Sequence, residues 1–392
     1  MGLKVKSSSK KELNNFPESE LVAILDADYC SYPCASVGDE VVIKVVHTKT
    51  GKEKEFKNKT AFQGRSSKTI GGWLGAENEK REGKGKKPFA LDDFTLEVVQ
   101  RRKKEFKILR DDDGEQTSIE ELSDDEALRN IFHSAKSVIL SGLKALGTDK
   151  YEAYLGKGKS FRLDVSTLKK YKGNRDKTLR PLVMSEVSEY IQKAFSAEVV
   201  TGIENDDKVV MRAYGDPNAV VVGVDKDHYG SPIKFFNVNR PEEGIIDGNC
   251  FGKLWVQGTG TKEKIRGFGR LFAYWQMCSE DTADNYKANC HSDVKWGAKS
   301  AYKLLCEAKD DKEAIELMIS CFKKLYPEPK VVESWRGHSM MIDWLYVMRE
   351  MYQLVTMKRW VGDSRTIDTE MEIYEVKYEY NTDTQNNNKT ED

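Results

Sequence analysis

Long hydrophobic runs are missing from this sequence. No apolar stretch approaches the roughly 18 residues that a membrane-spanning helix requires. The first residues, MGLKVKSSSKKE, also lack the apolar centre of a signal peptide. We therefore expect a soluble protein of the cytoplasm that has no membrane partner.

The cysteines form no recognisable disulfide or zinc pattern. There are 7 of them, an odd number, and no two are spaced as C-x-x-C. Such a set is typical of reduced thiols in a cytosol. Cys278, Cys290 and His291 would supply only part of a tetrahedral zinc site, so we do not expect zinc.

The chain also has no excess of one charge. Its 63 basic and 64 acidic residues leave a net charge of -1, which by itself does not indicate a nucleic-acid partner. The distribution is less even, because residues 150–180 carry ten Lys or Arg against three Asp or Glu. A hydrophobic content of 39% is enough for a large core, and 392 residues exceed one typical domain.

The pattern along the chain predicts a core with additions at both ends and in the middle. The expected parts are a flexible leader (1–20), an α/β core (21–270) with an insertion at about 41–130, a helical region (271–376) and a disordered tail (377–392). The helical region includes the runs LFAYWQMC, GAKSAYKLLCEA and MMIDWLYVMREMYQLVTMKRW.

Inside the insertion, Thr50-Gly51 predicts a β-hairpin turn. The oppositely charged blocks RRKKEFK and DDDGEQTSIEELSDDE predict a solvated arm or exposed helices. Apolar spacing predicts a helix over 124–146 and another that begins at Pro181 and runs to about 196.

Two apolar, β-branched runs end in the same acidic pattern. LVAILDAD (21–28) ends in Asp26 and Asp28, and AVVVGVDKD (219–227) ends in Asp225 and Asp227. Alternate residues of a strand point to the same side, so each pair can share a face. The carboxyl ends of parallel strands are where α/β proteins build their sites.

Two further acidic clusters accompany these strands. IENDD contains Glu204, Asp206 and Asp207, and SEDTADN contains Asp281 and Asp284. Residues three apart on a helix are neighbours, which would group Glu204 with Asp207 and, by the same spacing, Asp281 with Asp284. Any one cluster alone is most simply a helix start or a turn cap.

All four clusters together predict a metal site. Carboxylates about 4 Å apart repel by roughly 4 kcal/mol per pair at an effective dielectric near 20, so cations must neutralise them. Oxygen-only ligands favour Mg²⁺ or Mn²⁺. Two such ions about 3.5–4 Å apart are the usual machinery of phosphodiester hydrolysis.

A basic segment, FRLDVSTLKKYKGNRDKTLRP, lies between the first two clusters in the sequence. Alone it would indicate only a solvated surface. Beside a metal site it would supply positive charge for a phosphate substrate, and in a helix Lys172 and Arg175 would project together. Its charged and aromatic candidates are Lys169, Lys170, Tyr171, Lys172, Arg175, Lys177 and Arg180.

The order of these motifs resembles the flap endonuclease/5′→3′ exonuclease family, most closely its bacteriophage members. The family's E-A-D-D stands here as E-N-D-D, its D-G-D as D-K-D, its G-D-x-x-D-N as E-D-T-A-D-N, and its Y-K-x-N-R as YKGNR. Its G-x-K-T-A-x-x-L-L is echoed by Gly297, Lys299, Ser300, Ala301, Leu304 and Leu305. The resemblance covers residues 21–30 and 150–306.

The resemblance implies a PIN-like α/β core with a central, mostly parallel sheet and a C-terminal helix–three-turn–helix region that binds DNA and a monovalent cation such as K⁺. It implies that Lys172 and Arg175 contact the scissile phosphate. The implied ligands of two Mg²⁺ or Mn²⁺ ions are Asp26, Glu204, Asp206, Asp207, Asp225, Asp227, Asp281 and Asp284. We expect further DNA contacts from Lys169, Lys170, Tyr171, Lys177, Arg180, Gly297, Lys299 and Ser300.

The sequence departs from the family's pattern in three places. The family has another acidic ligand just before its GKGKS-like segment, where Gly156 or Lys157 stands here. Glu280 replaces a glycine before Asp281, and the loop YKANCHSDVKW lacks the usual glycine spacing. An ammonium at Lys157 could replace part of the charge of a weakly held ion, or it could point into solvent. Asp28 has no firm counterpart in the family.

These features together predict a metal-dependent 5′→3′ exodeoxyribonuclease with flap or structure-specific endonuclease activity. It would act on duplex DNA with a 5′ end, a nick or a flap, in replication or recombination, in the host-cell cytoplasm if a phage encodes it. Two alternatives stay open. One is a DNA-structure-binding protein with weakened catalysis, and the other is a ribonuclease acting on RNA·DNA hybrids.

Overall fold

The computed structural model describes residues 20–65 and 71–379, apart from the side chain of Lys177. The expected leader and tail therefore lie outside the described residues, except for residue 20 and residues 377–379. The chain forms two compact units. Of the described residues, one unit comprises 20–29, 138–178 and 191–379, and the other comprises 30–65, 71–137 and 179–190.

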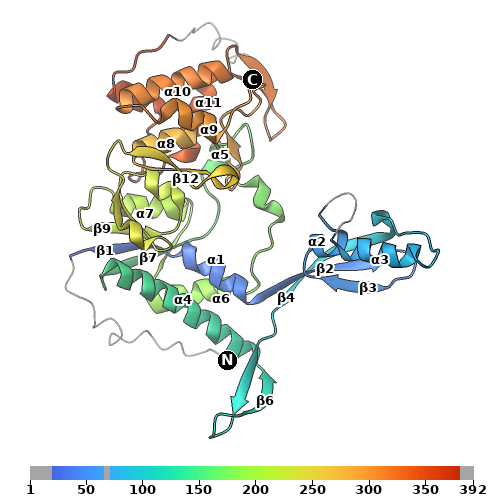
Figure 1. Cartoon of the computed structure of the whole chain (residues 1–392). Coiled ribbons are helices and arrows are strands. Elements are labelled where there is room, and N and C mark those ends of the chain that lie inside the picture. Colours follow the sequence, from blue (N-terminus) through green and yellow to red (C-terminus); the bar gives the residue numbers. More distant parts are fainter. Residues whose placement is uncertain (1–19, 66–70, 380–392) are drawn as a thin grey trace. The chain divides into compact units, whose positions relative to one another are not determined.

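The first unit contains a six-stranded sheet in the order β11-β10-β9-β1-β7-β8. Figure 1 labels its strands β1, β7 and β9. Every neighbouring pair is parallel except β10 and β11, so the expected α/β class with a mostly parallel central sheet is confirmed. The strands are β1 (Val22–Asp26), β7 (Tyr151–Gly156), β8 (Glu198–Val200), β9 (Ala219–Gly223), β10 (Lys234–Asn237) and β11 (Ile245–Asp247).

Helices cover both faces of this sheet. On one face, Val209 and Val210 of α7 (Asn205–Ala213) belong to the same buried cluster as Val221 of β9. On the other face, Gly142 of α4 (Asp124–Leu146) lies against Val222. Burial on two sides explains why β1 and β9 are continuous apolar runs.

The chain order places a switch point at β1. After β1 the chain builds β7 and β8 on one side, and it then crosses to build β9 and β10 on the other side. The crevice at the carboxyl ends of such strands is the usual position of a site in an open α/β sheet.

A helical core follows the sheet in the sequence. Phe272, Met318, Phe322, Leu345 and Met348 are among its buried side chains. Its helices are α8 (Arg270–Met277), α9 (Ala298–Leu305), α10 (Asp311–Leu325), α11 (Trp344–Val355) and α12 (Ile367–Ile373). Short hairpins also belong to this unit, namely β12 (Lys253–Gln257) with β13 (Lys264–Phe268), β14 (Glu280–Asp281) with β15 (Tyr286–Lys287), and β16 (Lys330–Glu333) with β17 (Ser339–Ile342).

The helix expected from MMIDWLYVMREMYQLVTMKRW is shorter than predicted. Its first apolar residues lie in β17, and α11 begins only at Trp344 because Asp343 accepts a hydrogen bond from the Tyr346 N–H at 2.7 Å. This is an N-cap that satisfies a free amide of the first turn. No helix in the described ranges has the length and apolarity of a membrane span.

The second unit contains a three-stranded antiparallel sheet, ordered β3-β2-β4. Its strands are β2 (Asp39–His47), β3 (Glu53–Phe56) and β4 (Phe94–Arg102), and the helices α2 (Lys59–Gln63) and α3 (Trp73–Glu82) complete it. Val45, Phe56, Phe62, Leu74 and Phe94 form its core. The hairpin expected around Thr50-Gly51 is confirmed.

One of the two remaining predicted helices has the expected bounds, and the other begins later than expected. α4 matches the predicted 124–146, whereas α6 (Met184–Phe195) begins three residues after Pro181. Of the two structures expected for the oppositely charged blocks, the solvated arm is observed, and only the last three residues of the acidic block, 124–126, are helical, at the start of α4. The blocks pair as an exposed antiparallel hairpin, β5 (Phe106–Arg110) with β6 (Gln116–Glu121), in which Lys107 lies 3.6 Å from Glu120 across the strands. Short helical and turn segments that belong to the site are α1 (Asp28–Val37) and α5 (Arg162–Val165).

Candidate metal centre

Seven carboxylates from four segments of the chain line one cavity of about 250 Å³ in the first unit. They are Asp26, Asp28, Glu204, Asp206, Asp225, Asp227 and Asp284. Asp26 ends β1, and Asp225 follows β9, its parallel neighbour. The cavity therefore lies at the carboxyl edge of the sheet, beside the switch point.

The two D-x-D pairs reach the cavity differently from the prediction. Strand β9 ends at Gly223, and Asp225 caps a 3₁₀ helix (Lys226–Gly230) by accepting a hydrogen bond from the Asp227 N–H at 2.9 Å. Strand β1 ends at Asp26, and Asp28 already belongs to α1. The pairs are thus grouped by tight turns after the strands, and the expected alternation along a strand is wrong.

Asp28 occupies the place beside Gly156 where the family resemblance suggested a missing carboxylate. Its two oxygens lie 3.1 and 3.3 Å from the Gly156 amide nitrogen, which donates to them. A Cβ at residue 156 would lie 2.7 Å from Asp28 Oδ2. Burial, together with the charge of Asp26, raises the pKa of Asp28 to about 8. Lys157 is exposed and does not line the cavity.

The carboxylates form two groups that could each hold a metal ion. Ligand atoms of Asp26, Asp206 and His228 lie within 4.8 Å of one another, and so do those of Asp227, Asp281 and Asp284. Nearly all of these donors are oxygens, which suits hard divalent cations such as Mg²⁺ and Mn²⁺.

Electrostatics also favour a cation in this cavity. Burial raises the pKa of Asp225, with a further contribution from Asp206. Burial and the charge of Asp225 raise the pKa of Asp227 well above its usual range. Burial likewise raises the pKa of Asp284. Carboxyl groups that resist ionisation together would ionise readily beside a bound divalent cation.

The basic segment is attached to the loop that carries Asp284. The Lys172 N–H donates to the Asp284 carbonyl oxygen at 2.9 Å, and the Asn285 side chain donates to the Lys170 carbonyl oxygen at 2.9 Å. Lys172 adopts a left-handed backbone conformation with a φ of 55°. The segment continues as a 3₁₀ helix (Gly173–Lys177), so the α-helix considered for Lys172 and Arg175 does not form.

Lys172 and Arg175 nevertheless point to the same place. Lys172 Nζ pairs with Glu204 and lies 3.8 Å from Asp284 Oδ1. Arg175 Nη2 lies 2.9 Å from the same Asp284 oxygen. In Lys172, burial opposes the charge, but Glu204 and Asp284 raise the pKa above its usual value. Both cations therefore lie at the edge of the acidic cavity.

Asp207 does not reach this cavity. Its side chain is fully buried and accepts hydrogen bonds from Arg162 at 2.6 and 3.0 Å and from the Lys358 N–H at 2.9 Å. Arg162 is also fully buried and bonds Glu204 and the carbonyl oxygen of Leu354. The structure therefore assigns Asp207 to a buried ion pair, which corrects its expected place among the metal ligands.

Tyr171 is also placed differently from the prediction. It is buried, and its hydroxyl lies 3.0 Å from Glu204 Oε2 and 3.2 Å from Asp284 Oδ2. It therefore holds two carboxylates in position and offers no free ring for DNA.

The other expected DNA contacts are dispersed. Lys170 lies 2.5 Å from Asp176, and Lys299 lies 2.6 Å from Glu263. Gly297 precedes α9 as its N-cap. Lys169 and Ser300 are half-buried, Arg180 is exposed, and the side chain of Lys177 lies outside the described residues. These assignments and the monovalent cation expected near α9 stay predictions.

Sequence reasoning missed two residues of this centre. Arg162 looks like one more cation of a basic surface segment, and no local signal reveals its burial. His228 directly follows the D-K-D motif, which is a signal that could have been used. Burial lowers the pKa of His228, but Asp206 and Asp26 together raise it well above its usual value.

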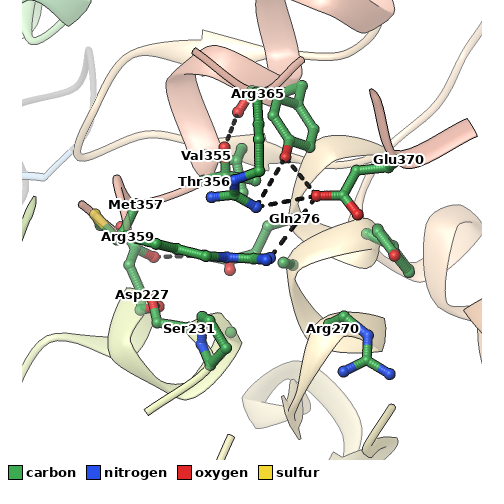
Figure 2. Close-up of a pocket in the computed structure, with 15 residues that line it drawn as sticks. Asp227, Ser231, Arg270, Gln276, Val355, Thr356, Met357, Arg359, Arg365 and Glu370 are labelled. Carbon is green, nitrogen blue, oxygen red and sulfur yellow. Dashed lines mark hydrogen bonds and ion pairs between the residues drawn. The ribbon is translucent and has the colours of Figure 1, made fainter. Parts of the chain in front are cut away.

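A second, much smaller cavity of about 30 Å³ adjoins Asp227 (Figure 2). The Tyr352 hydroxyl donates to Glu370 Oε1 at 2.7 Å, and Arg365 bonds the same oxygen at 3.1 Å. Gln276 of α8 donates to Asp227 Oδ1. The space is that of about one water molecule. We interpret the Tyr352, Arg365 and Glu370 contacts as a structural ion network that lines the same cavity as Asp227, which is itself held by Gln276.

Comparison of the chain with models of protein families, with curated proteins and with solved structures finds no match in any of the three.

Proposed function

We propose that this protein is a metal-dependent 5′ nuclease that hydrolyses phosphodiester bonds of DNA at 5′ ends, nicks or flaps. The observation that carries the proposal is the cavity in which seven carboxylates converge, with Lys172 and Arg175 at its edge. A buried acidic cavity needs cations, and a phosphate substrate needs both the cations and the adjacent basic groups.

The fold and the motif order support the same proposal. A parallel sheet with its switch point at β1 is compatible with a PIN-like core, and the acidic motifs occur in the order that the flap endonuclease/5′→3′ exonuclease family uses. We propose α9 and its preceding Gly297 as part of a helix–three-turn–helix unit that binds duplex DNA and a monovalent cation such as K⁺.

Two Mg²⁺ or Mn²⁺ ions would bind, one at each of the two acidic groups. When bound, such ions lower the pKa of a water molecule and stabilise negative charge on the phosphate. Asp26 and Asp206 would serve one group, and Asp227, Asp281 and Asp284 the other.

The protein's own cations would then change partners. Lys172 and Arg175 pair with Glu204 and Asp284. Once those carboxylates face metal ions, the ammonium and guanidinium groups become available to a phosphate oxygen. Their charge would stabilise the transition state more than the ground state, because negative charge develops at that phosphate. Tyr171 keeps Glu204 and Asp284 in position throughout.

Asp28 argues against weakened catalysis. The sequence departs from the family at residues 156 and 157, which is the main reason to consider a protein that only binds DNA. A carboxylate from α1 lies at this place, hydrogen-bonded to the Gly156 amide. The number of carboxylates is therefore maintained by a different residue.

The test is digestion of 5′-labelled and 3′-labelled duplex, nicked, flap and RNA·DNA hybrid substrates, with Mg²⁺, Mn²⁺ or a chelator. We expect metal-dependent cleavage that releases the 5′ label first, and no cleavage by the Asp225→Asn variant. DNA binding without cleavage in either metal would favour the binding protein. Cleavage confined to the RNA strand of hybrids would favour the ribonuclease.

A further inference from the structure

His228 is a buried polar side chain without a hydrogen-bond partner among the described residues. It is fully buried, and neither ring nitrogen forms a hydrogen bond of acceptable geometry with any described group. Buried polar groups in proteins nearly always have a partner, so an exception of this kind requires an explanation.

The imidazole is directed at two carboxylates of the acidic cavity. Nε2 lies 3.3 Å from Asp206 Oδ1 and 3.8 Å from Asp26 Oδ2. Neither carboxylate oxygen accepts a hydrogen bond from the imidazole ring. Ligand bonds of about 2.1 Å separate neighbouring ligand atoms by roughly 3–4 Å, so both distances from Nε2 suit a shared metal ion. One ligand atom from each of the three residues lies within 4.8 Å of the other two.

The ring is also held in this orientation by its surroundings. Phe235 of β10 packs against it with ring centroids 5.2 Å apart. Gly223, at the end of β9, lies beside the ring, because a Cβ there would approach His228 Cδ2 to 3.8 Å. The imidazole therefore has little freedom to turn away from Asp26 and Asp206.

We propose that His228 supplies a nitrogen ligand, so that the site formed with Asp26 and Asp206 prefers a first-row transition cation such as Mn²⁺ to Mg²⁺. This inference rests on one part of the proposed function, namely that the acidic cavity binds metal ions. Mg²⁺ favours oxygen ligands and retains its water, whereas imidazole is a good ligand for transition cations. The two metal positions would then differ, because Asp227, Asp281 and Asp284 offer oxygen alone.

The first test is pulsed electron paramagnetic resonance of the full-length, metal-free protein loaded with Mn²⁺ at sub-stoichiometric amounts. We expect modulation from a directly bound imidazole ¹⁴N nucleus. Its absence from the wild-type spectrum overturns the proposal, whatever any variant does.

The second test is calorimetric titration of the same protein and of His228→Gln with Mn²⁺ and with Mg²⁺. We expect the substitution to remove the ¹⁴N modulation and to weaken Mn²⁺ binding about 10-fold or more, while Mg²⁺ binding changes less than about 3-fold. The matched control is His338→Gln, since His338 is exposed and lies on the hairpin connection between β16 and β17. Equal losses for both metals would make His228 a positioning residue and overturn the proposal.

These experiments distinguish a failure of this inference from a failure of the proposed function. A protein that binds neither metal contradicts the acidic cavity as a metal site. A protein that cleaves DNA with Mg²⁺ and Mn²⁺ equally, and whose Mn²⁺ shows no nitrogen ligand, keeps its function and loses only the inference about His228.

Discussion

Asp206 and Asp207 are adjacent in the sequence, and their substitution by asparagine should have opposite consequences. Asp207 is fully buried and paired with the fully buried Arg162. Asp206 lines the acidic cavity, where it raises the pKa of Asp225 and lies 3.3 Å from His228 Nε2. We expect Asp207→Asn to destabilise the fold while metal binding persists, and Asp206→Asn to weaken metal binding while the metal-free fold is retained or becomes more stable.

The expected magnitude follows from the contacts of Arg162. Removing one partner of a buried ion pair typically costs about 3–5 kcal/mol. Asparagine at 207 keeps one acceptor for the guanidinium, and Glu204 remains at 2.8 Å from Nη1. The loss should therefore lie near the lower limit, at about 3 kcal/mol of the free energy of unfolding. For a denaturant dependence of about 3 kcal/mol/M, the urea midpoint would fall by about 1 M.

The assay is urea unfolding in the presence of a chelator, followed by tryptophan fluorescence. Of the 7 tryptophans only Trp73 belongs to the second unit, so the signal reports mainly the first. Calorimetric titration of the folded variants with Mn²⁺ completes the comparison. If Asp207→Asn lowers the stability by less than about 1 kcal/mol and abolishes metal binding, Asp207 is a ligand and our assignment of it to Arg162 is wrong.

Three further predictions concern the cavity. Lys172→Ala and Arg175→Ala should lower the single-turnover cleavage rate at saturating DNA at least 10-fold while DNA affinity changes little; unchanged rates would remove both residues from the chemical step. Lys157→Asp should leave the Mg²⁺ concentration for half-maximal cleavage within about 2-fold of wild type, because Lys157 is exposed; a clear decrease would place it beside the metals. In the presence of a chelator, the melting temperature should fall as the pH rises toward 8. The pKa of Asp28 is about 8 in the folded protein and near 4 in an unfolded chain, so the folded state binds the proton more tightly and loses this advantage as the pH rises. For Asp28→Asn, the melting temperature should fall less steeply between pH 5 and 9 than it does for the wild type. If both proteins show the same pH dependence, Asp28 is not its cause.

Two strands of the central sheet, β1 and β9, were predictable because they are continuous apolar runs, whereas β7, β8, β10 and β11 were not predicted. Continuous β-branched runs such as 219–223 need burial on both faces, which favours a parallel sheet covered by helices. The convergence of the acidic clusters followed from the same geometry, since the carboxyl ends of β1 and β9 lie next to each other.

The partner of each carboxylate was not predictable. Successive residues of a helix point about 100° apart, so Asp206 and Asp207 face different surroundings, and only the tertiary fold decides which of them meets Arg162. Arg162 lies 45 residues away in the sequence. The hairpin β16–β17 was missed for a different reason, because strands of four residues next to an apolar helix leave no clear alternation.

Gly156 and Asp28 share one space at the carboxyl edge of the sheet. The volume that a side chain at 156 would need is filled by the Asp28 carboxylate, 2.7 Å from the missing Cβ. An ancestor or descendant with a carboxylate at 156 would have to lose the one at 28 first, because the intermediate carrying both would be crowded and doubly charged. We therefore expect the two positions to exclude each other's carboxylates, so that a homologue with aspartate at the strand end should carry a small, uncharged residue at the helix start.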